Sequence, residues 1–192
     1  MGFTREELLS FRDTEVPDLI GDDCRLLIVG INPGLWTAAV GAHFARPGNR
    51  FYPALYRAGI VDRQIDASAG MSAADRDLLC GRRVGITNVV SRATATAAEL
   101  SADELRAGGR RLRETVRLVA PRVVAVAGIT AYRSAFDERR AVAGPQTETW
   151  NGAQVWVVPN PSGLNAHETV DTLAAAYGAA ARAAGILPES DV

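Results

Sequence analysis

The chain of 192 residues contains no lysine, so all 21 of its basic residues are arginines. Lysine is needed by the phosphate-binding P-loop, and a lysine amine usually forms the Schiff base of enzymes that work through one. Arginine stays charged and cannot form that covalent bond. The composition therefore excludes P-loop chemistry, and it leaves Schiff-base chemistry only to the amino group of the N-terminus.

Cysteine and histidine are almost as scarce, with two residues of each. Cys24 and Cys80 cannot supply the four thiolates of a typical iron–sulfur cluster or zinc site. His43 and His167 add little to such a set of ligands. Both cysteines are typical of buried structural thiols, and we expect no metal ion and no cofactor.

Long apolar runs are also absent, because no stretch approaches the roughly 20 residues that a membrane-spanning helix needs. The first residues, MGFTREELLSF, carry acidic side chains and lack the apolar core of a signal peptide. We therefore expect a cytoplasmic protein with no membrane contact. The length is typical of one domain, and we expect residues 1–192 to form it.

The net charge of −1 is unlike that of a general DNA-binding protein. If DNA is the substrate, arginines must be gathered on one face of the molecule. An arginine-rich stretch is a candidate for that face, but within it residues 106–117 are more typical of the solvated side of a helix. Its members are Arg82, Arg83, Arg92, Arg106, Arg110, Arg111, Arg113 and Arg117.

What the sequence does have is an alternation of short apolar runs with helical patterns. Four runs rich in valine and isoleucine have the near-continuous hydrophobicity of strands that are covered on both faces. The alternation predicts an α/β fold, a three-layer α/β/α sandwich around a short, mainly parallel four-stranded sheet. The predicted strands cover residues 25–31, 83–90, 122–129 and 154–159.

Capping signals indicate where the helices begin. Thr4 with Glu7 has the spacing of a capping box, and so has Ser101 with Glu104. Asn49 can cap a further helix. We predict a short helix after Thr4 and helices over residues 51–58, 101–119, 129–136 and 168–184. Gly185 ends the last one, and we expect the chain beyond it to fray.

Two unusual turns follow the first and last predicted strands, at the sheet edge where ligands of α/β folds bind. GINPG, residues 30–34, holds Asn32 between two glycines and beside a stiffening proline. NPSGLN, residues 160–165, places Leu164 among polar neighbours. Such a leucine either packs in the core or enters a base stack. Taken singly, each motif is also typical of a plain structural turn.

A third segment, HFARPGNRFY at residues 43–52, lies between the two turns. Its Phe44 either packs in the core or stacks on a flat base. Ser162 of the last turn is not in the G-x-S-x-G elbow of hydrolases, so we do not expect it to be a nucleophile.

Together these segments resemble the mismatch-specific uracil-DNA glycosylase family, which includes the eukaryotic thymine-DNA glycosylases. The likeness extends from about residue 25 to residue 185 and rests on GINPG, FARPGNRF, the AGGR of residues 107–110 and VVPNPSGLN. It implies an α/β/α sandwich and a monomeric bacterial enzyme of base excision repair. Such an enzyme hydrolyses the N-glycosidic bond of uracil in double-stranded DNA and leaves an abasic site.

The resemblance also implies roles for single residues. Asn32 corresponds to the asparagine that positions the attacking water, and the backbone of Ile31 would hold the base edge. Phe44 would stack on the flipped base. Asn160 would support the site and contact DNA. The wedge that replaces the extruded base would comprise Gly163 and Leu164 with Ser162 and Asn165 beside them. Gly34 and Thr37 are candidate phosphate contacts. His167 is a further candidate, but its position is also typical of an exposed helix N-terminus.

The chemistry of these residues agrees with that assignment. A carboxamide has no useful basicity, so Asn32 can orient a water but cannot deprotonate it strongly. The reaction must then be largely dissociative, with backbone donors stabilising the departing base anion. GINPG has no carboxylate to assist, which predicts slow turnover. Without lysine we expect no lyase step after base removal.

Several positions depart from the bacterial pattern of this family. Asn88 stands where that pattern has lysine, and it becomes a candidate contact to the base or the water. Ser91 replaces a common aspartate, and Trp36 and Thr37 replace a serine pair. Ala166 replaces an arginine, which puts the reading of an opposite guanine in doubt.

We expect uracil opposite guanine as a substrate, and deaminated purines such as xanthine and hypoxanthine remain open. Two other functions also remain open at this stage. One is a non-catalytic module that binds mismatches or abasic sites in DNA. The other is a small-molecule nucleoside hydrolase of the α/β class.

Overall fold

The computed structural model describes residues 2–189 and confirms the predicted α/β fold. The sheet has the strand order β2-β1-β3-β5-β4. Its first four strands in that order are parallel, whereas β4 runs antiparallel to β5 at the edge. The strands are β1 (Leu26–Gly30), β2 (Val84–Asn88), β3 (Val123–Ala127), β4 (Gly144–Trp150) and β5 (Ala153–Val158).

The predicted number of four strands is wrong, because the edge strand β4 was not expected. Its sequence, GPQTETW, is mostly polar and its side chains are largely half-buried or exposed, so it lacks the apolar run of an inner strand. The turn to β5 is formed by Asn151 and Gly152, which have φ angles of 49° and 88°. An Asn-Gly pair is a strong signal for a two-residue hairpin turn.

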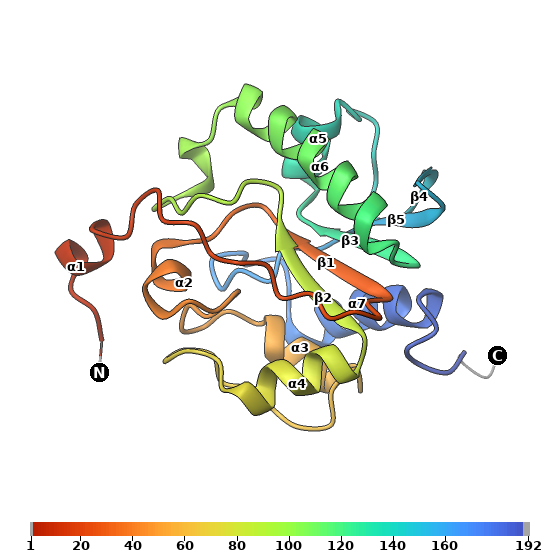
Figure 1. Cartoon of the computed structure of the whole chain (residues 1–192), viewed down its shortest axis with the longest axis horizontal. Helices are drawn as coiled ribbons and strands as arrows, with labels where there is room; N and C mark the ends of the chain where they lie inside the picture. The colour runs from red at the N-terminus through yellow and green to blue at the C-terminus, as the bar shows by residue number, and fades with distance from the viewer. Residues whose placement is uncertain (1, 190–192) are drawn as a thin grey trace.

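Helices cover both faces of the sheet, which gives the three predicted layers (Figure 1). Leu26 and Ile28 of β1 face one helical layer, and Leu27 and Val29 face the other. The first layer contains α3 (Phe51–Arg57), α4 (Ala73–Gly81) and α7 (Val170–Ala183), and the second contains α5 (Ala102–Val119) and α6 (Ile129–Phe136). Three short helices, α1 (Arg5–Leu9), α2 (Leu35–Val40) and the 3-10 turn η1 (Ala97–Glu99), complete the described elements.

The capping signals place most helix starts correctly. The capping boxes at Thr4 and Ser101 are present. Asn49 stands one residue before the N-cap of α3, where its side chain accepts a hydrogen bond of 2.9 Å from the amide of Phe51. The short helices α2 and α4 were not predicted, although Ser72 and Asp75 form a capping box before α4.

The end of the last helix is partly as expected. Helix α7 begins at Val170, two residues later than predicted, and Gly185 follows it with a φ angle of 68°. The expectation that the chain frays after Gly185 is wrong for Ile186 and Leu187, which pack against the core and donate hydrogen bonds to Ala181. For residues 190–192 the expectation lies outside the described residues.

Two adjacent glycines let α5 pack against backbone on both sides. A Cβ atom at Gly108 would lie 2.1 Å from the carbonyl oxygen of Val89, just beyond β2. A Cβ atom at Gly109 would lie 2.6 Å from the carbonyl oxygen of Ala135 in α6. Neither carbonyl oxygen can rotate away. Helix α5 can therefore pack this closely only because residues 108 and 109 have no side chain.

Gly108→Ala is therefore expected to destabilise the protein by about 1–3 kcal/mol, as overpacked cores do. Gly178→Ala in α7 is the matched control, because its added Cβ would meet no atom closer than 3.5 Å. That control should be neutral or more stable by up to about 1 kcal/mol, since alanine favours helix more than glycine does. Denaturant unfolding measures both, and equal effects would contradict the packing argument.

The arginine-rich stretch proves to be largely paired. Most of its members contact carboxylates, as in Arg83 with Asp23 and Arg117 with Glu114. Arg82 instead donates to the carbonyl groups of Ile60 and Gly59. For Arg106, Arg113 and Arg117, which lie on α5, this pairing supports the interpretation as a solvated helix face. The remaining pairs are Arg92 with Asp13 and Glu104, Arg106 with Asp103, and Arg113 with Glu148.

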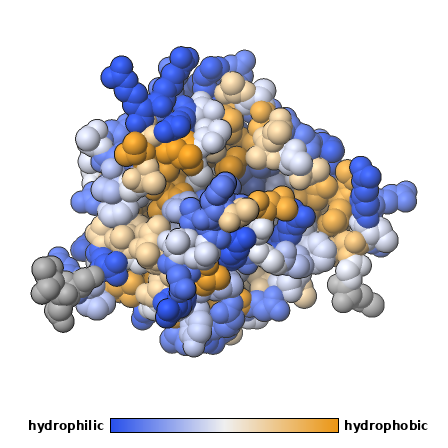
Figure 2. Space-filling model, turned by 180° about the vertical axis from the view of Figure 1, so that it is seen from behind, coloured by the Kyte–Doolittle hydropathy of each residue, from blue (hydrophilic) through white to orange (hydrophobic). Residues whose placement is uncertain are grey.

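The surface has no broad apolar patch on the face drawn in Figure 2, where apolar side chains lie in small groups among hydrophilic ones. Within residues 2–189, no helix is both long and apolar enough to cross a membrane. The same residues contain no cluster of three metal-ligating side chains.

Candidate active site

A cavity of about 300 Å³ lies at the carboxyl ends of the parallel strands. It is lined by the turn after β1, the loop of residues 43–49, the end of β2, the segment of residues 94–97 and the loop after β5. The fold therefore brings the two unusual turns together. The expected site residues that line the cavity are Ile31, Asn32, Gly34, Thr37, Phe44, Asn88, Asn160, Ser162 and Leu164.

The side chain of Asn32 is held in one orientation by hydrogen bonds from its amide nitrogen. This nitrogen lies 3.1 Å from the carbonyl oxygen of Arg92, 2.8 Å from the hydroxyl of Thr94 and 3.1 Å from the carbonyl oxygen of Pro33. All donors of the amide are thus engaged. The amide oxygen has no donor among the described residues and is available as an acceptor at the cavity.

Thr94 fixes the direction of its hydrogen bond with the Asn32 side chain. Its hydroxyl donates its single hydrogen to the carbonyl oxygen of Thr96 at 2.8 Å, so it can only accept from Asn32. The side chain is 1% exposed, which leaves water no access to compete. Thr94 also donates its backbone amide to Pro33 at 3.1 Å. No sequence motif indicates this residue, because it contacts Asn32 across 62 positions of the chain.

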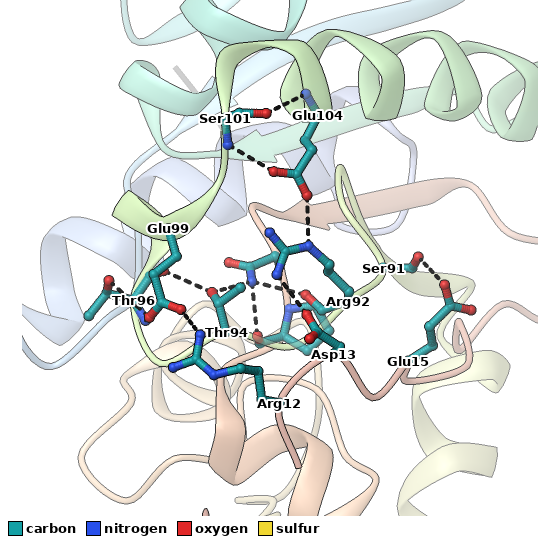
Figure 3. A network of polar contacts seen from close by, with 12 residues as sticks. Arg12, Asp13, Glu15, Ser91, Arg92, Thr94, Thr96, Glu99, Ser101 and Glu104 are labelled. Atoms are coloured by element: carbon teal, nitrogen blue, oxygen red, sulfur yellow. Dashed lines mark hydrogen bonds and ion pairs between the residues drawn. The ribbon is translucent and has the colours of Figure 1, made fainter. Parts of the chain in front are cut away.

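The segment that carries Arg92 and Thr94 is itself held by charged groups (Figure 3). The Arg92 guanidinium donates to Glu104 at 2.7 Å and to Asp13 at 2.8 Å. Glu104 also caps α5. The hydrogen bond from Arg92, followed by that from the Ser101 backbone, lowers the pKa of Glu104 to about 2. The carboxylate is therefore charged at neutral pH, and it ties this segment to the start of α5.

The N-terminal segment packs against the same stretch. The backbone of Asp13 donates to Ala93, and Ala93 donates to Thr14, both at 2.9 Å. Ser91 donates to Glu15 at 2.8 Å, and it does not line the cavity (Figure 3). Ser91, at the position where the family resemblance implies aspartate, thus helps to hold the N-terminal segment against residues 91–94.

Phe44 has a strained backbone, with a φ angle of 54°. Its ring stacks on Phe51 with centroids 4.0 Å apart and planes inclined by 25°. The side chain is half-buried and also lines the cavity. Phe44 therefore packs against the core and also offers a surface to a flat ligand in the cavity. Strain of this kind is common at functional sites.

His43 and Asn88 both line the cavity and contact each other. Nδ1 of His43 lies 3.1 Å from the amide nitrogen of Asn88, and Nε2 lies 2.9 Å from the carbonyl oxygen of Pro17. Burial lowers the pKa of His43 below its usual value, so the ring is neutral at pH 7. Both ring nitrogens are engaged, which argues against a role for this histidine as a general base.

The loop after β5 is organised by Arg50, a residue that no sequence motif indicates. Its guanidinium donates to the carbonyl oxygens of Asn165 at 3.0 Å, of Gly163 at 3.1 Å and of Glu168. The Arg50 backbone amide donates to Pro161 at 3.0 Å. The loop is therefore held against the residue that precedes α3, and Arg50 satisfies three of its backbone carbonyl groups.

Gly163 permits the closest part of this contact, because a Cβ atom there would lie 2.5 Å from the carbonyl oxygen of Gly48. Leu164 next to it is 78% exposed, which excludes the core-packing alternative for this leucine. It is the most exposed of the large apolar side chains described, and it flanks the cavity. A fixed loop that presents an exposed leucine is suited to entering a stack of bases.

The remaining expected residues are divided between the cavity and the surface. Oδ1 of Asn160 accepts from the Ser162 amide at 2.9 Å, and the Ser162 hydroxyl accepts from Leu164 at 3.3 Å. Thr37 lies in the first turn of α2 and is buried. Gly163, Asn165 and His167 do not line the cavity, and the exposed His167 lies in the loop before α7.

The lining of the cavity has a marked chemical character. Of the described residues that line it, none carries a carboxylate, and Arg46 alone carries a permanent charge. Amide and hydroxyl groups are its other polar side chains, apart from the neutral imidazole of His43. Such a site can orient a water and hold a flat polar ligand, but it offers no strong base.

Comparison with known proteins gives a family match and a fold match. Residues 17–180 match the family model of the uracil DNA glycosylase superfamily. The fold is similar to the solution NMR structure of a candidate uracil DNA glycosylase from Methanosarcina acetivorans, with a TM-score of 0.60 and 16% sequence identity. The match covers 90% of this chain and 96% of that one.

Proposed function

The chain belongs to the uracil DNA glycosylase superfamily, and from this premise we propose that it excises uracil from G·U mismatches in DNA. Hydrolysis of the N-glycosidic bond leaves an abasic site, and the strand stays intact. The observation that carries this proposal is the fixed amide of Asn32, whose available oxygen faces a cavity beside the exposed Leu164.

In this proposal the Asn32 oxygen accepts a hydrogen bond from a water and aims its lone pair at the sugar carbon. Because the amide nitrogen is anchored to Arg92 and Thr94, the side chain loses little freedom when the water binds. A carboxamide takes no proton from that water. Bond breaking therefore runs ahead of attack, and the base leaves as an anion. The water then adds to the sugar cation, and the proton that it loses goes to the base anion or to bulk solvent.

The absence of carboxylates from the described lining has two consequences for rate. No negative charge repels the departing base anion, and none stabilises the positive charge that develops on the sugar. We therefore propose a slow enzyme that relies on binding and water placement. Since the chain has no lysine, we also propose that it does not cleave the strand after removing the base.

A substrate panel tests this function. Uracil release is measured from duplexes with uracil opposite guanine or adenine, from a single strand and from free deoxyuridine. Release should be found for the G·U duplex and not for free deoxyuridine. Cleavage of deoxyuridine alone would instead identify a nucleoside hydrolase, and tight DNA binding without release would identify a binding module.

Thr94→Val should lower the single-turnover rate roughly tenfold, because valine cannot accept the hydrogen bond that orients Asn32. Thr94→Ser keeps the hydroxyl and is expected to retain most of the rate. Both variants are compared with the original chain on a G·U duplex, and their melting temperatures are measured alongside. A Thr94→Val rate equal to that of Thr94→Ser would contradict the anchoring role.

A further inference from the structure

We propose that the N-terminal segment, residues 3–16, sets the rate of the reaction by holding together the two stretches of chain that orient the Asn32 amide. We call these residues the N-terminal strap. The inference rests on the proposed function, because it concerns the rate of base excision. No residue of the strap, all of which the structure describes, lines the cavity. The strap therefore consists of positioning residues that act through Asn32.

The anchor of Asn32 lies outside the regular elements of the fold. The Asn32 amide donates to the carbonyl oxygen of Arg92 and to the hydroxyl of Thr94. Residues 92–94 follow β2 and precede η1, so they belong neither to the sheet nor to a helix. Isolated bridges join Arg92 to Glu15 of the strap and Thr94 to Gly34 of the GINPG turn. This short stretch is thus held between the strap on one side and the turn that carries Asn32 on the other.

The strap holds residues 92–94 through backbone and charged contacts (Figure 3). Ala93 lies between the two residues that anchor Asn32, and it exchanges backbone hydrogen bonds of 2.9 Å with Asp13 and Thr14. The Asp13 carboxylate accepts from the Arg92 guanidinium at 2.8 Å. The preceding residue, Arg12, forms an ion pair with Glu99 of η1. The strap therefore holds both acceptors that this stretch offers to the Asn32 amide.

The strap also contacts the other stretch, the helix that follows the GINPG turn. Helix α2 begins at Leu35, directly after Gly34. Apolar side chains of the strap pack in one small cluster with those of α2 and with Ala93. The cluster comprises Leu8, Phe11 and Val16 of the strap, Leu35 and Ala38 of α2, and Ala93. It joins the turn that carries Asn32 to the stretch that anchors it.

Trp36 of α2 extends this contact surface. Its indole N–H donates to the carbonyl oxygen of Ser68 at 2.9 Å, which fixes the ring. The ring of Phe3 meets it in a T-shaped arrangement, with centroids 5.0 Å apart and planes inclined by 81°. The family resemblance implies a serine at position 36, and a serine would offer the strap no such surface. The departure at Trp36 thus has a physical reason, which is the seating of the strap.

The cost of loosening the strap follows from geometry. The Asn32 oxygen must aim a water at one carbon atom, and a shift of about 1 Å in a positioning group costs roughly 100-fold in rate. Exposed ion pairs contribute little to stability, because solvent screens them. Removing the charged contacts of the strap should therefore slow excision, while the fold and the affinity for DNA persist.

The test exchanges two residues of the strap together, Arg12→Ala with Asp13→Gly. Glycine suits the φ angle of 63° at position 13, so the backbone is not strained. With protein in excess over a G·U duplex, the single-turnover rate should fall roughly tenfold, while affinity and melting temperature change little. The Ala93 amide, which donates to Thr14, should exchange its hydrogen faster, as NMR measures.

Two further variants serve as controls. Arg12→Ala with Asp13→Asn keeps an acceptor for Arg92, and it should recover part of the lost rate and part of the lost protection at Ala93. Glu114→Ala with Arg117→Ala removes an exposed ion pair on α5 that does not line the cavity. This second control should alter neither the excision rate nor the exchange at Ala93.

An Asn32→Ala background separates positioning from a general defect. If the strap acts through Asn32, the Arg12→Ala and Asp13→Gly exchanges should slow an Asn32→Ala protein by less than about twofold, since residues that act as a unit are not additive. A tenfold loss in that background, a strap variant within about twofold of the original rate, or an unchanged exchange at Ala93 would overturn the proposal. If the original chain releases no uracil, the proposed function fails, whereas the exchange at Ala93 still shows whether the strap holds this stretch.

Discussion

Replacing Asn32 with alanine is expected to lower the excision rate at least roughly 100-fold, which is the scale of losing a positioned reactant. Affinity for uracil-containing DNA should change by no more than about twofold, because the amide acts on the water and not on the ground-state complex. The physical reason is the anchoring of the Asn32 nitrogen by Arg92 and Thr94, which leaves only the oxygen to hold a water. Single-turnover kinetics and a binding titration on the same G·U duplex measure the two effects.

A matched control is available at Asn151, which lies in the hairpin turn between β4 and β5 with a φ angle of 49°. Asn151→Gly suits that backbone and should leave the rate unchanged. Melting temperatures of both variants show whether the fold is intact. An Asn32→Ala protein that folds, binds DNA and retains the original rate would remove Asn32 from the mechanism.

Leu164→Ala is expected to slow excision from a duplex by roughly 10- to 100-fold, because extruding a base from a duplex costs a few kcal/mol that the wedge must offset. A single strand has no partner base to displace, so its rate should fall by less than about threefold. The prediction depends on the 78% exposure of Leu164 beside the cavity and on its rigid support by Arg50. Rates on matched single- and double-stranded oligonucleotides give the ratio.

Leu118→Ala is the control for this effect, since Leu118 is 69% exposed on α5 and does not line the cavity. It should leave both rates unaltered. Equal losses on both substrates in Leu164→Ala would show that the leucine does not act as a wedge. The outcome would then favour a role in shaping the cavity itself.

The layers of the fold could be predicted because they depend on local signals. Buried parallel strands produce continuous apolar runs, and capping boxes at Thr4 and Ser101 mark helix starts. The edge strand β4 has one face toward solvent and a polar sequence, so its own residues gave little indication of a strand. The Asn151–Gly152 turn was the local signal that could have revealed it.

The candidate site was predictable only in part, because only some of its residues belong to local sequence motifs. GINPG and NPSGLN end strands, so their meeting at one sheet edge follows from parallel topology. The residues that orient them make contacts at long sequence separation. Thr94 reaches Asn32 across 62 positions, and Arg50 reaches Gly163 across 113. No pattern in the sequence marks a threonine or an arginine for such a contact, and only the folded chain reveals it.

The most direct test of the account uses one duplex with a single uracil opposite guanine and an excess of the protein. After incubation, half of the sample is treated with hot alkali, which breaks DNA at abasic sites, and both halves are separated by size. We predict a break at the uracil position in the alkali-treated half and an intact strand in the untreated half, and with Asn32→Ala we predict no break in either half. An intact strand after alkali, at full enzyme excess, would contradict the proposal that this chain is a uracil-excising glycosylase.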